Sequence, residues 1–192
     1  MSFETASCRP AGGALLRSGA RPGDTLWVSG RLGDARLALE GLRAAVTLDA
    51  GASARVREAM ELPEPRVALG LALRGIATSA IDLSDGLAGD LAHVLRRSGV
   101  GATVNADALP MSPDLAAQPT ALQRLCTLAG GDDYELLFTA SPHARDAVLR
   151  AAGEAGVEVT AIGRIEAAPG ARFVDGRGAP VSGFAGFDHF AS

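Results

Sequence analysis

Two aspartates, Asp82 and Asp85, stand three positions apart where the expected structure of the chain changes. Residues 76–81 are short, apolar and partly β-branched, as in a buried strand, and from Leu87 the apolar residues recur at helical spacing. If the chain turns at Ser84, both carboxylates converge on one point. A magnesium ion takes one or two carboxylates and completes its shell with water and phosphate oxygens. The alternative is structural, with Ser84 as helix cap and Asp85 complementing the helix dipole.

The helix that follows is predicted to be amphipathic. Leu87, Leu91 and Val94 share one face, and Asp90 and His93 fall on the other, so the sequence places Asp90 toward solvent. The backbone amides at the start of this helix are expected to be free to bind phosphate oxygens.

A second acidic motif, Gly-Gly-Asp-Asp-Tyr, occupies residues 130–134 and precedes an apolar strand at 135–139. Glycines let a backbone approach a ligand closely, and adjacent acids beside an aromatic ring suit a cationic ligand or a metal. A plain tight turn is the alternative. Similarly, three of the six phenylalanines lie in residues 183–190, where they either dock the tail on the core or form a stacking surface.

Composition limits the classes of function. The 192 residues are 47% hydrophobic, with a net charge of -4, which gives no support to nucleic-acid binding. No apolar run reaches the roughly 20 residues that a membrane span needs, and residues 1–13 do not resemble a secretory signal, so a cytoplasmic protein is expected. Cys8 and Cys126 are expected to be inert thiols. All 18 basic residues are arginines, which excludes a lysine-dependent P-loop and a pyridoxal phosphate Schiff base.

The chain reads as a poorly patterned segment, residues 1–13, followed by a single domain over 14–192. Strands are predicted at 25–29, 76–81, 102–104, 135–139, 157–161 and 172–174, with a further extended piece near Val181. Helices are predicted at 34–46, 54–60, 66–75, 120–128 and from 142 to about 153, in addition to the one after the aspartates. The helix at 66–75 is apolar nearly all round and is therefore predicted to be buried.

Four ordered segments, 14–24, 80–87, 130–138 and 186–190, together resemble thiamine-monophosphate kinase. They cover nearly the whole chain but resemble only the C-terminal domain of that family, which belongs to the group related to aminoimidazole ribonucleotide synthetase. The resemblance implies an α+β fold, a layered α/β/α domain with a mixed, largely antiparallel sheet. It also implies that the N-terminal domain, which binds ATP and dimerises, is absent from this chain.

By this resemblance, the enzyme is a phosphotransferase that passes the γ-phosphoryl group of ATP to thiamine monophosphate, giving thiamine diphosphate. Asp82 and Asp85 fall on magnesium-ligand positions, and Ser84 and Arg17 on nucleotide-binding positions. Asp132 and Phe187 fall where the family binds the thiamine substrate. No catalytic residue is assigned beyond the metal ligands, because phosphoryl transfer needs positioning and charge neutralisation rather than a covalent nucleophile.

Half of the metal and phosphate site would then come from the missing N-terminal domain. We therefore expect the chain to be inactive or nearly so alone, and a homodimer is possible. The alternative is a non-catalytic module, or truncated fragment, that binds nucleotide or thiamine phosphate. Its partners would be these small molecules, with no nucleic acid and no membrane.

Overall fold

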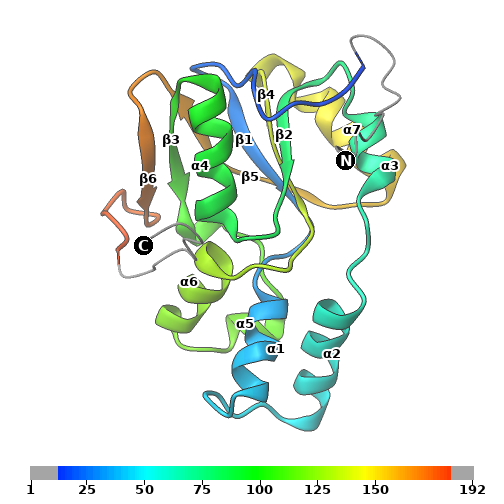
Figure 1. The fold of residues 1–192 in the computed structure, drawn as a ribbon, viewed down its shortest axis with the longest axis vertical. Coiled ribbons are helices and arrows are strands. Elements are labelled where there is room, and N and C mark those ends of the chain that lie inside the picture. Colours follow the sequence, from blue (N-terminus) through cyan, green and yellow to red (C-terminus); the bar gives the residue numbers. More distant parts are fainter. Residues whose placement is uncertain (1–12, 183–192) are drawn as a thin grey trace, which may run out of the picture.

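The computed structural model describes residues 13–182, and Figure 1 shows them as one sheet with helices on both sides and a helical arm below it. The strands are β1 (Thr25–Ser29), β2 (Ala77–Asp82), β3 (Gly101–Asn105), β4 (Leu136–Ala140), β5 (Val159–Glu166) and β6 (Gly170–Val174). The α-helices are α1 (Asp34–Leu42), α2 (Ala50–Glu61), α3 (Val67–Ala72), α4 (Leu87–Ser98), α5 (Pro113–Ala116), α6 (Thr120–Ala129) and α7 (Arg145–Ala155). Two short 3-10 helices are η1 (Ala106–Ala108) and η2 (Pro142–Ala144).

The six strands lie in the order β2-β4-β1-β5-β3-β6. Every neighbouring pair is antiparallel except β3 and β6, which are parallel. The expectation of a mixed, largely antiparallel sheet is therefore confirmed. Because β2 is an edge strand, only its β4 side belongs to the ladder, and its other side faces the segment before β1.

The two faces of the sheet carry separate cores because successive side chains of a strand point in opposite directions. In β1, Leu26 and Val28 pack with α4 residues such as Leu91, whereas Trp27 joins the opposite cluster with residues of α3 and α7. Trp27 stacks on Phe138 of β4, with ring centroids 6.3 Å apart. These two cores establish the α/β/α layering (Figure 1).

The helical arm has a third core of its own. Buried residues of α1, α2, α5 and α6 meet beneath the sheet, namely Leu37, Ala38, Val56, Leu115 and Cys126. Burial raises the pKa of the Cys126 thiol to about 12, as expected of an inert thiol. In the described part of the chain, no helix is long and apolar enough to cross a membrane.

Several element predictions need correction. The predicted helix at 66–75 is only α3, and it is not buried all round, since Val67 is 65% and Leu71 59% exposed. The predicted helix at 54–60 is the longer α2, which begins after Asp49 because that carboxylate accepts a hydrogen bond from Ala52 N (2.8 Å). Up to residue 182, the extended piece expected near Val181 contributes only a single bridge to β6, between Val174 and Pro180.

Candidate functional site

The two acidic motifs lie side by side because β2 and β4 are antiparallel neighbours. We call residues 82–86 the aspartate loop and residues 130–135 the glycine turn. Asp82 pairs with Leu136 at the end of the strand ladder. Three backbone hydrogen bonds extend the ladder, from Leu83 N to Glu135 O (2.8 Å), Tyr134 N to Leu83 O (2.8 Å) and Asp132 N to Ser84 O (3.0 Å). Motifs far apart in the sequence therefore form one continuous surface.

Glycines permit this close approach. A Cβ atom on Gly131 would lie 2.4 Å from the carbonyl oxygen of Ser84, and one on Gly86 would lie 2.9 Å from the carbonyl oxygen of Gly130. Gly86 also has a φ of 101°, a conformation that favours glycine. A larger residue at either position would force the aspartate loop and the glycine turn apart.

The aspartate loop is held from beneath by Asp90, which the helical pattern wrongly placed toward solvent. Asp90 is only 3% exposed, and its Oδ2 accepts hydrogen bonds from Ser84 N and Asp85 N, both at 3.0 Å. Burial raises the pKa of the Asp90 carboxyl. The expectation that amides at this turn are free for phosphate is therefore wrong for these two amides.

Ser84 does not cap the helix either. Helix α4 begins at Leu87, its N-cap is Gly86, and no side chain caps that end. The structural alternative for Ser84 therefore fails, and its half-buried side chain lies with Asp85 and Asp132 along one hollow of about 460 Å³.

The negative charges of three exposed carboxylates raise the pKa of the Tyr134 hydroxyl group. The charge of Asp132 is the main cause that raises the pKa of this hydroxyl, together with the hydrogen bond that Tyr134 Oη donates to Asp132 Oδ1 (3.3 Å). Asp82 and Asp85 raise it further. The same ring borders an apolar pocket of about 440 Å³ that contains Pro63, Pro65 and Val67 and has Asp82 at its edge.

The donor atoms present suit a hard divalent cation. Asp82 and Asp85 are both exposed and offer carboxylate oxygens, which magnesium prefers, and it completes its shell with water and phosphate oxygens. Within residues 13–182, no group of three or more His, Cys, Asp or Glu residues is arranged to hold a metal. If magnesium binds here, Asp82 and Asp85 are the two residues that would hold it.

In the glycine turn, alternate residues point in opposite directions. Asp132 and Tyr134 are exposed, and both have left-handed backbones, with φ of 65° and 51°. Such a conformation costs a residue other than glycine about 1 kcal/mol. Asp133 and Glu135 point inward instead. The turn therefore exposes the Asp132 side chain at the cost of a strained backbone at Asp132.

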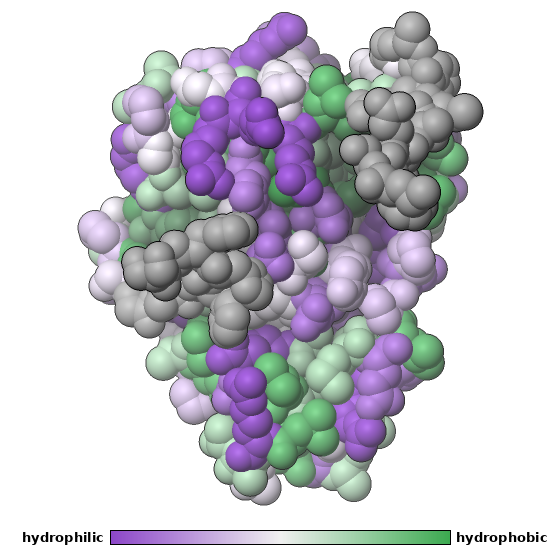
Figure 2. All heavy atoms as spheres, in the orientation of Figure 1, coloured by the Kyte–Doolittle hydropathy of each residue, from purple (hydrophilic) through white to green (hydrophobic). Residues whose placement is uncertain are grey.

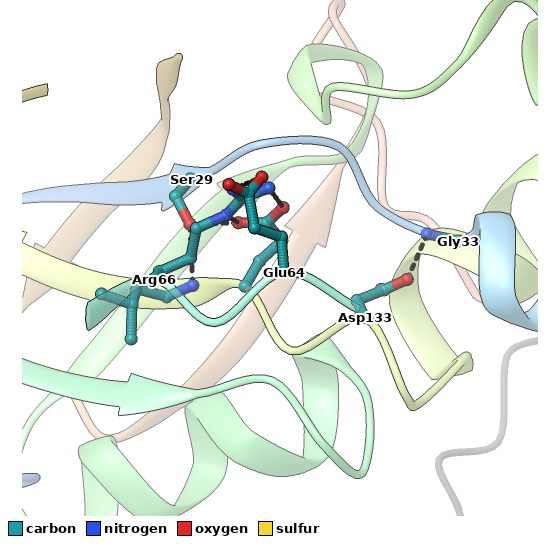
Figure 3. Close-up of polar contacts among 7 residues, drawn as sticks. Ser29, Gly33, Glu64, Arg66 and Asp133 are labelled. Carbon is teal, nitrogen blue, oxygen red and sulfur yellow. Dashed lines mark hydrogen bonds and ion pairs between the residues drawn. The ribbon is translucent and has the colours of Figure 1, made fainter. Parts of the chain in front are cut away.

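Asp133 ties the turn to the helical arm. Its Oδ1 accepts a hydrogen bond of 2.8 Å from the backbone N–H of Gly33, the residue before α1, as Figure 3 shows. Burial is the main cause that holds the pKa of the Asp133 carboxyl well above its usual range, although the Gly33 N–H lowers it. Asp133 is therefore an anchor, whereas the side chain of its neighbour Asp132 is exposed and contacts only Tyr134 among the hydrogen-bond partners in the described residues.

Glu135 anchors the same turn to the sheet. Arg66 donates two hydrogen bonds to its carboxylate, from Nε (2.8 Å) and Nη2 (2.7 Å). Ser29 Oγ donates to Glu135 Oε2 (2.5 Å) and accepts from Leu136 N (2.8 Å). Arg66 also reaches Glu64 (2.7 Å), and Figure 3 shows this group of contacts between β1 and the segment before α3. The network fixes where β4 begins.

Arg17 lies on another side of Asp82. Both residues line a groove of about 750 Å³ beside β2, whereas Ser84, Asp85 and Asp132 line the smaller hollow described above. Asp82 therefore stands between the groove and the apolar pocket near Tyr134. Phe187, the other predicted substrate contact, lies outside the described residues.

Known proteins match the chain over most of its length. The family described as AIR synthase related protein, C-terminal domain, matches residues 21–176. The chain belongs to this family. Among curated relatives of this AIR synthase related domain, the thiamine-monophosphate kinase of Salmonella typhimurium is 44% identical over 188 residues, which are 95% of this chain and 57% of the relative.

Solved structures agree with the AIR synthase related assignment. Thiamine-monophosphate kinase from Stenotrophomonas maltophilia is 41% identical with a TM-score of 0.80, and the match covers 88% of this chain and 55% of that one. AaThiL complexed with AMPPCP and TMP is 30% identical with a TM-score of 0.74, and the match covers 92% of this chain and 54% of that one. The chain thus spans little more than half the length of these relatives.

The sequence did not reveal the residues that hold the aspartate loop and the glycine turn in place. Asp90, Asp133, Glu135 and Arg66 all hold the two motifs in place, and the sequence predicted this role for none of them. One signal was available for Asp90, because a carboxylate within the first turn or so of a helix can reach back to amides before it. No local signal could pair Arg66 with Glu135, since that contact depends on how the segment before α3 lies beside the start of β4.

Proposed function

We propose that this chain supplies the C-terminal part of a thiamine-monophosphate kinase site, at which the γ-phosphoryl group of ATP passes to thiamine monophosphate. The observation that carries this proposal is the pairing of the two turns, which brings Ser84, Asp85 and Asp132 to one hollow with Asp82 next to it. The names of its relatives, and the AMPPCP and TMP in the AaThiL complex, support the choice of nucleotide and substrate.

The residues divide the work according to their chemistry. Asp82 and Asp85 would hold magnesium, which when bound neutralises charge on the phosphate oxygens. Ser84 and Arg17 would bind the nucleotide, the first as a hydroxyl beside the metal ligands and the second as a guanidinium. Asp132 would contact the thiamine substrate, whose thiazolium ring is cationic, and Phe187 would do so from the tail.

Asp90 and Asp133 contribute by positioning. Asp90 accepts hydrogen bonds from the backbone amides of Ser84 and Asp85 and would so orient the Asp85 side chain. Asp133 holds the glycine turn against α1, which fixes the backbone of Asp132. Phosphoryl transfer depends mainly on such prearranged groups, because the protein forms no bond with the transferred group.

We further propose that the N-terminal part found in the relatives completes the site, so that this chain alone is inactive or nearly so. Two carboxylates are few for a reaction that spreads charge over several phosphate oxygens. The assembled enzyme would act in the cytoplasm, and two copies could associate through that N-terminal part.

A coupled assay of thiamine diphosphate formation tests this function. The chain should give little product alone and measurable product when mixed with the N-terminal part of the Stenotrophomonas maltophilia relative. Asp82→Asn and Asp85→Asn should each lower kcat at least about 100-fold, since each removes a charged metal ligand. Asp146→Asn is the matched control, because Asp146 is an exposed aspartate in the first turn of α7.

Two outcomes would reject parts of this proposal. Full activity of the chain alone would show that the N-terminal part is not needed. Unchanged activity of Asp82→Asn and Asp85→Asn in the mixture would remove both residues from the site.

A further inference from the structure

The groove of about 750 Å³ that contains Arg17 holds two more arginines without an assigned role. Residues 13–18 form one wall as they pass along the open edge of β2, joined to it by a hydrogen bond from Ala80 N to Leu16 O (2.8 Å). The other walls come from α3, from the end of α4 and from β2 itself. Arg74, just after α3, and Arg97, in the last turn of α4, both line this space.

These arginines lack the partners that most others have. Arg17, Arg74 and Arg97 are exposed, and none forms an ion pair with a carboxylate of the described residues. Eight other arginines in that part of the chain do form ion pairs, namely Arg36, Arg43, Arg55, Arg57, Arg66, Arg124, Arg164 and Arg172.

The groove is therefore positive in a protein whose net charge is -4. Its lining has three guanidinium groups and one carboxylate, that of Asp82. Figure 2 shows strongly hydrophilic side chains gathered over the upper end of α4 on this face. Between the charged groups the lining is apolar, with Leu15, Leu71 and Ile81 among its members.

This combination fits a phosphorylated ligand. A guanidinium presents a planar fork of N–H donors that matches two phosphate oxygens, and it stays charged at all ordinary pH values. The apolar walls offer few other polar side chains, so a phosphorylated ligand in the groove would meet mainly the guanidinium groups. Three guanidinium groups carry a charge of +3, which a polyphosphate matches better than the charge of about -2 on a single phosphate group.

We propose that Arg74 and Arg97, together with Arg17, bind the phosphate groups of a phosphorylated ligand in this groove. The inference rests on the proposed function and extends it, because it adds two phosphate-binding residues on the side of Asp82 away from Asp132. A polyphosphate such as that of a nucleotide is the ligand that this charge favours over the single phosphate of thiamine monophosphate.

Isothermal titration calorimetry on the full chain tests the inference with three probes: inorganic tripolyphosphate, AMPPCP with magnesium, and thiamine monophosphate. Arg74→Ala and Arg97→Ala should each weaken the affinity for tripolyphosphate and AMPPCP at least about five-fold, and the double variant more. Arg74→Lys should fall between wild type and alanine, because it keeps the charge but loses the fork. Arg150→Ala is the matched control, since Arg150 is exposed and also lacks an ion pair with the described residues.

Each outcome decides the question. Loss in Arg74→Ala and Arg97→Ala but not in Arg150→Ala supports the site, and the probe that binds more tightly identifies its source of phosphate. Equal loss in all three variants would show unspecific attraction and overturn the proposal, as would unchanged affinity or no binding of any probe. Tripolyphosphate binding requires no phosphoryl transfer, so this test can succeed even if the kinase assay fails.

Discussion

The aspartate loop and the glycine turn are neighbours with similar composition, but they are stabilised in different ways. The aspartate loop receives its support from outside, because Asp90 of α4 accepts the amides of Ser84 and Asp85. In the glycine turn, the supporting side chains belong to the turn itself. Asp133 accepts a hydrogen bond from Gly33, and Glu135 accepts hydrogen bonds from Arg66 and Ser29. The turn also has two left-handed residues, whereas in the loop the only positive φ belongs to a glycine.

In both regions, some acidic side chains are exposed and others are buried as hydrogen-bond acceptors. Asp82, Asp85 and Asp132 are exposed, while Asp90 and Glu135 are buried and accept hydrogen bonds. A carboxylate here is therefore either exposed at the surface or an acceptor that supports the two motifs. The difference also means that damage to the glycine turn should spread to α1, β1 and α3, whereas damage to the aspartate loop should stay local.

The largest effect is expected from Glu135→Ala. The change leaves Arg66, whose side chain is 16% exposed, without its bidentate partner and Ser29 without its acceptor. Removing one member of a buried ion pair typically lowers the free energy of unfolding by about 3–5 kcal/mol. Urea denaturation would measure it, with Glu64→Ala as control, because Glu64 also contacts Arg66 but is 79% exposed and should matter by less than about 1 kcal/mol. Equal effects would contradict the distinction between buried and exposed partners.

A smaller effect is expected from Asp90. Asp90→Leu leaves two amides of the aspartate loop without an acceptor, which should lower the free energy of unfolding by about 1–3 kcal/mol. Asp90→Asn keeps an acceptor oxygen and should retain most of the stability. Hydrogen exchange of the Ser84 and Asp85 amides, followed by NMR, should accelerate in the leucine variant only. Faster exchange across α1 as well would show that loop and turn are not supported separately.

Neighbouring acids of the glycine turn should respond in opposite directions. Asp133→Ala removes the acceptor for Gly33 N and should lower the free energy of unfolding by about 1 kcal/mol. Asp132→Gly relieves a left-handed backbone and should raise it by up to about 1 kcal/mol, while removing the proposed substrate carboxylate. Thermal denaturation of both variants provides the comparison. A loss of stability in Asp132→Gly would mean that the turn is not strained at this residue.

The smallest effect concerns pH. The pKa of Asp133 lies above the ordinary value near 4 in the folded protein. At pH values between the ordinary pKa and the raised pKa, the Asp133 carboxyl is therefore protonated more often in the folded state than in the unfolded state. The contribution of this group to stability is therefore full below about pH 4 and falls as the pH rises toward the raised value. Asp133→Asn does not titrate, so its stability relative to wild type should increase with pH. A constant difference would contradict the raised pKa.

Sequence patterns predicted the strands and the position of both acidic motifs, because these depend on local periodicity and on glycine-rich turns. The layered fold was implied by the family resemblance. The pairing of the motifs depends on strand order, which no local pattern contains. The ends of helices were also predicted less accurately than the strands. At α4 the alternative interpretation made Ser84 the helix cap, but the loop is held by Asp90, a residue that helical periodicity assigns to the polar face. Periodicity describes an ideal helix and cannot show that a polar residue near its start turns inward to satisfy the backbone.

Exposure of α3 was missed for a related reason. Its apolar composition favoured burial, but the short helix covers only part of the sheet face and buries Leu69 while Val67 and Leu71 remain exposed. Hydrophobicity predicts that a residue gains from burial, not that another part of the described chain is there to cover it.

The separate core of the helical arm has a consequence for cooperativity. The buried cluster of the arm is distinct from the core that packs α4 on the sheet, and a segment with its own cluster can open as a unit while the rest stays folded. The hydrogen bond from Gly33 to Asp133 lies at that boundary, so each opening of the arm also releases the glycine turn. Arg36 of α1 and Asp132 of the turn border the same hollow. A ligand that bridges them would therefore slow amide exchange throughout α1, and the arm would report occupancy of the site.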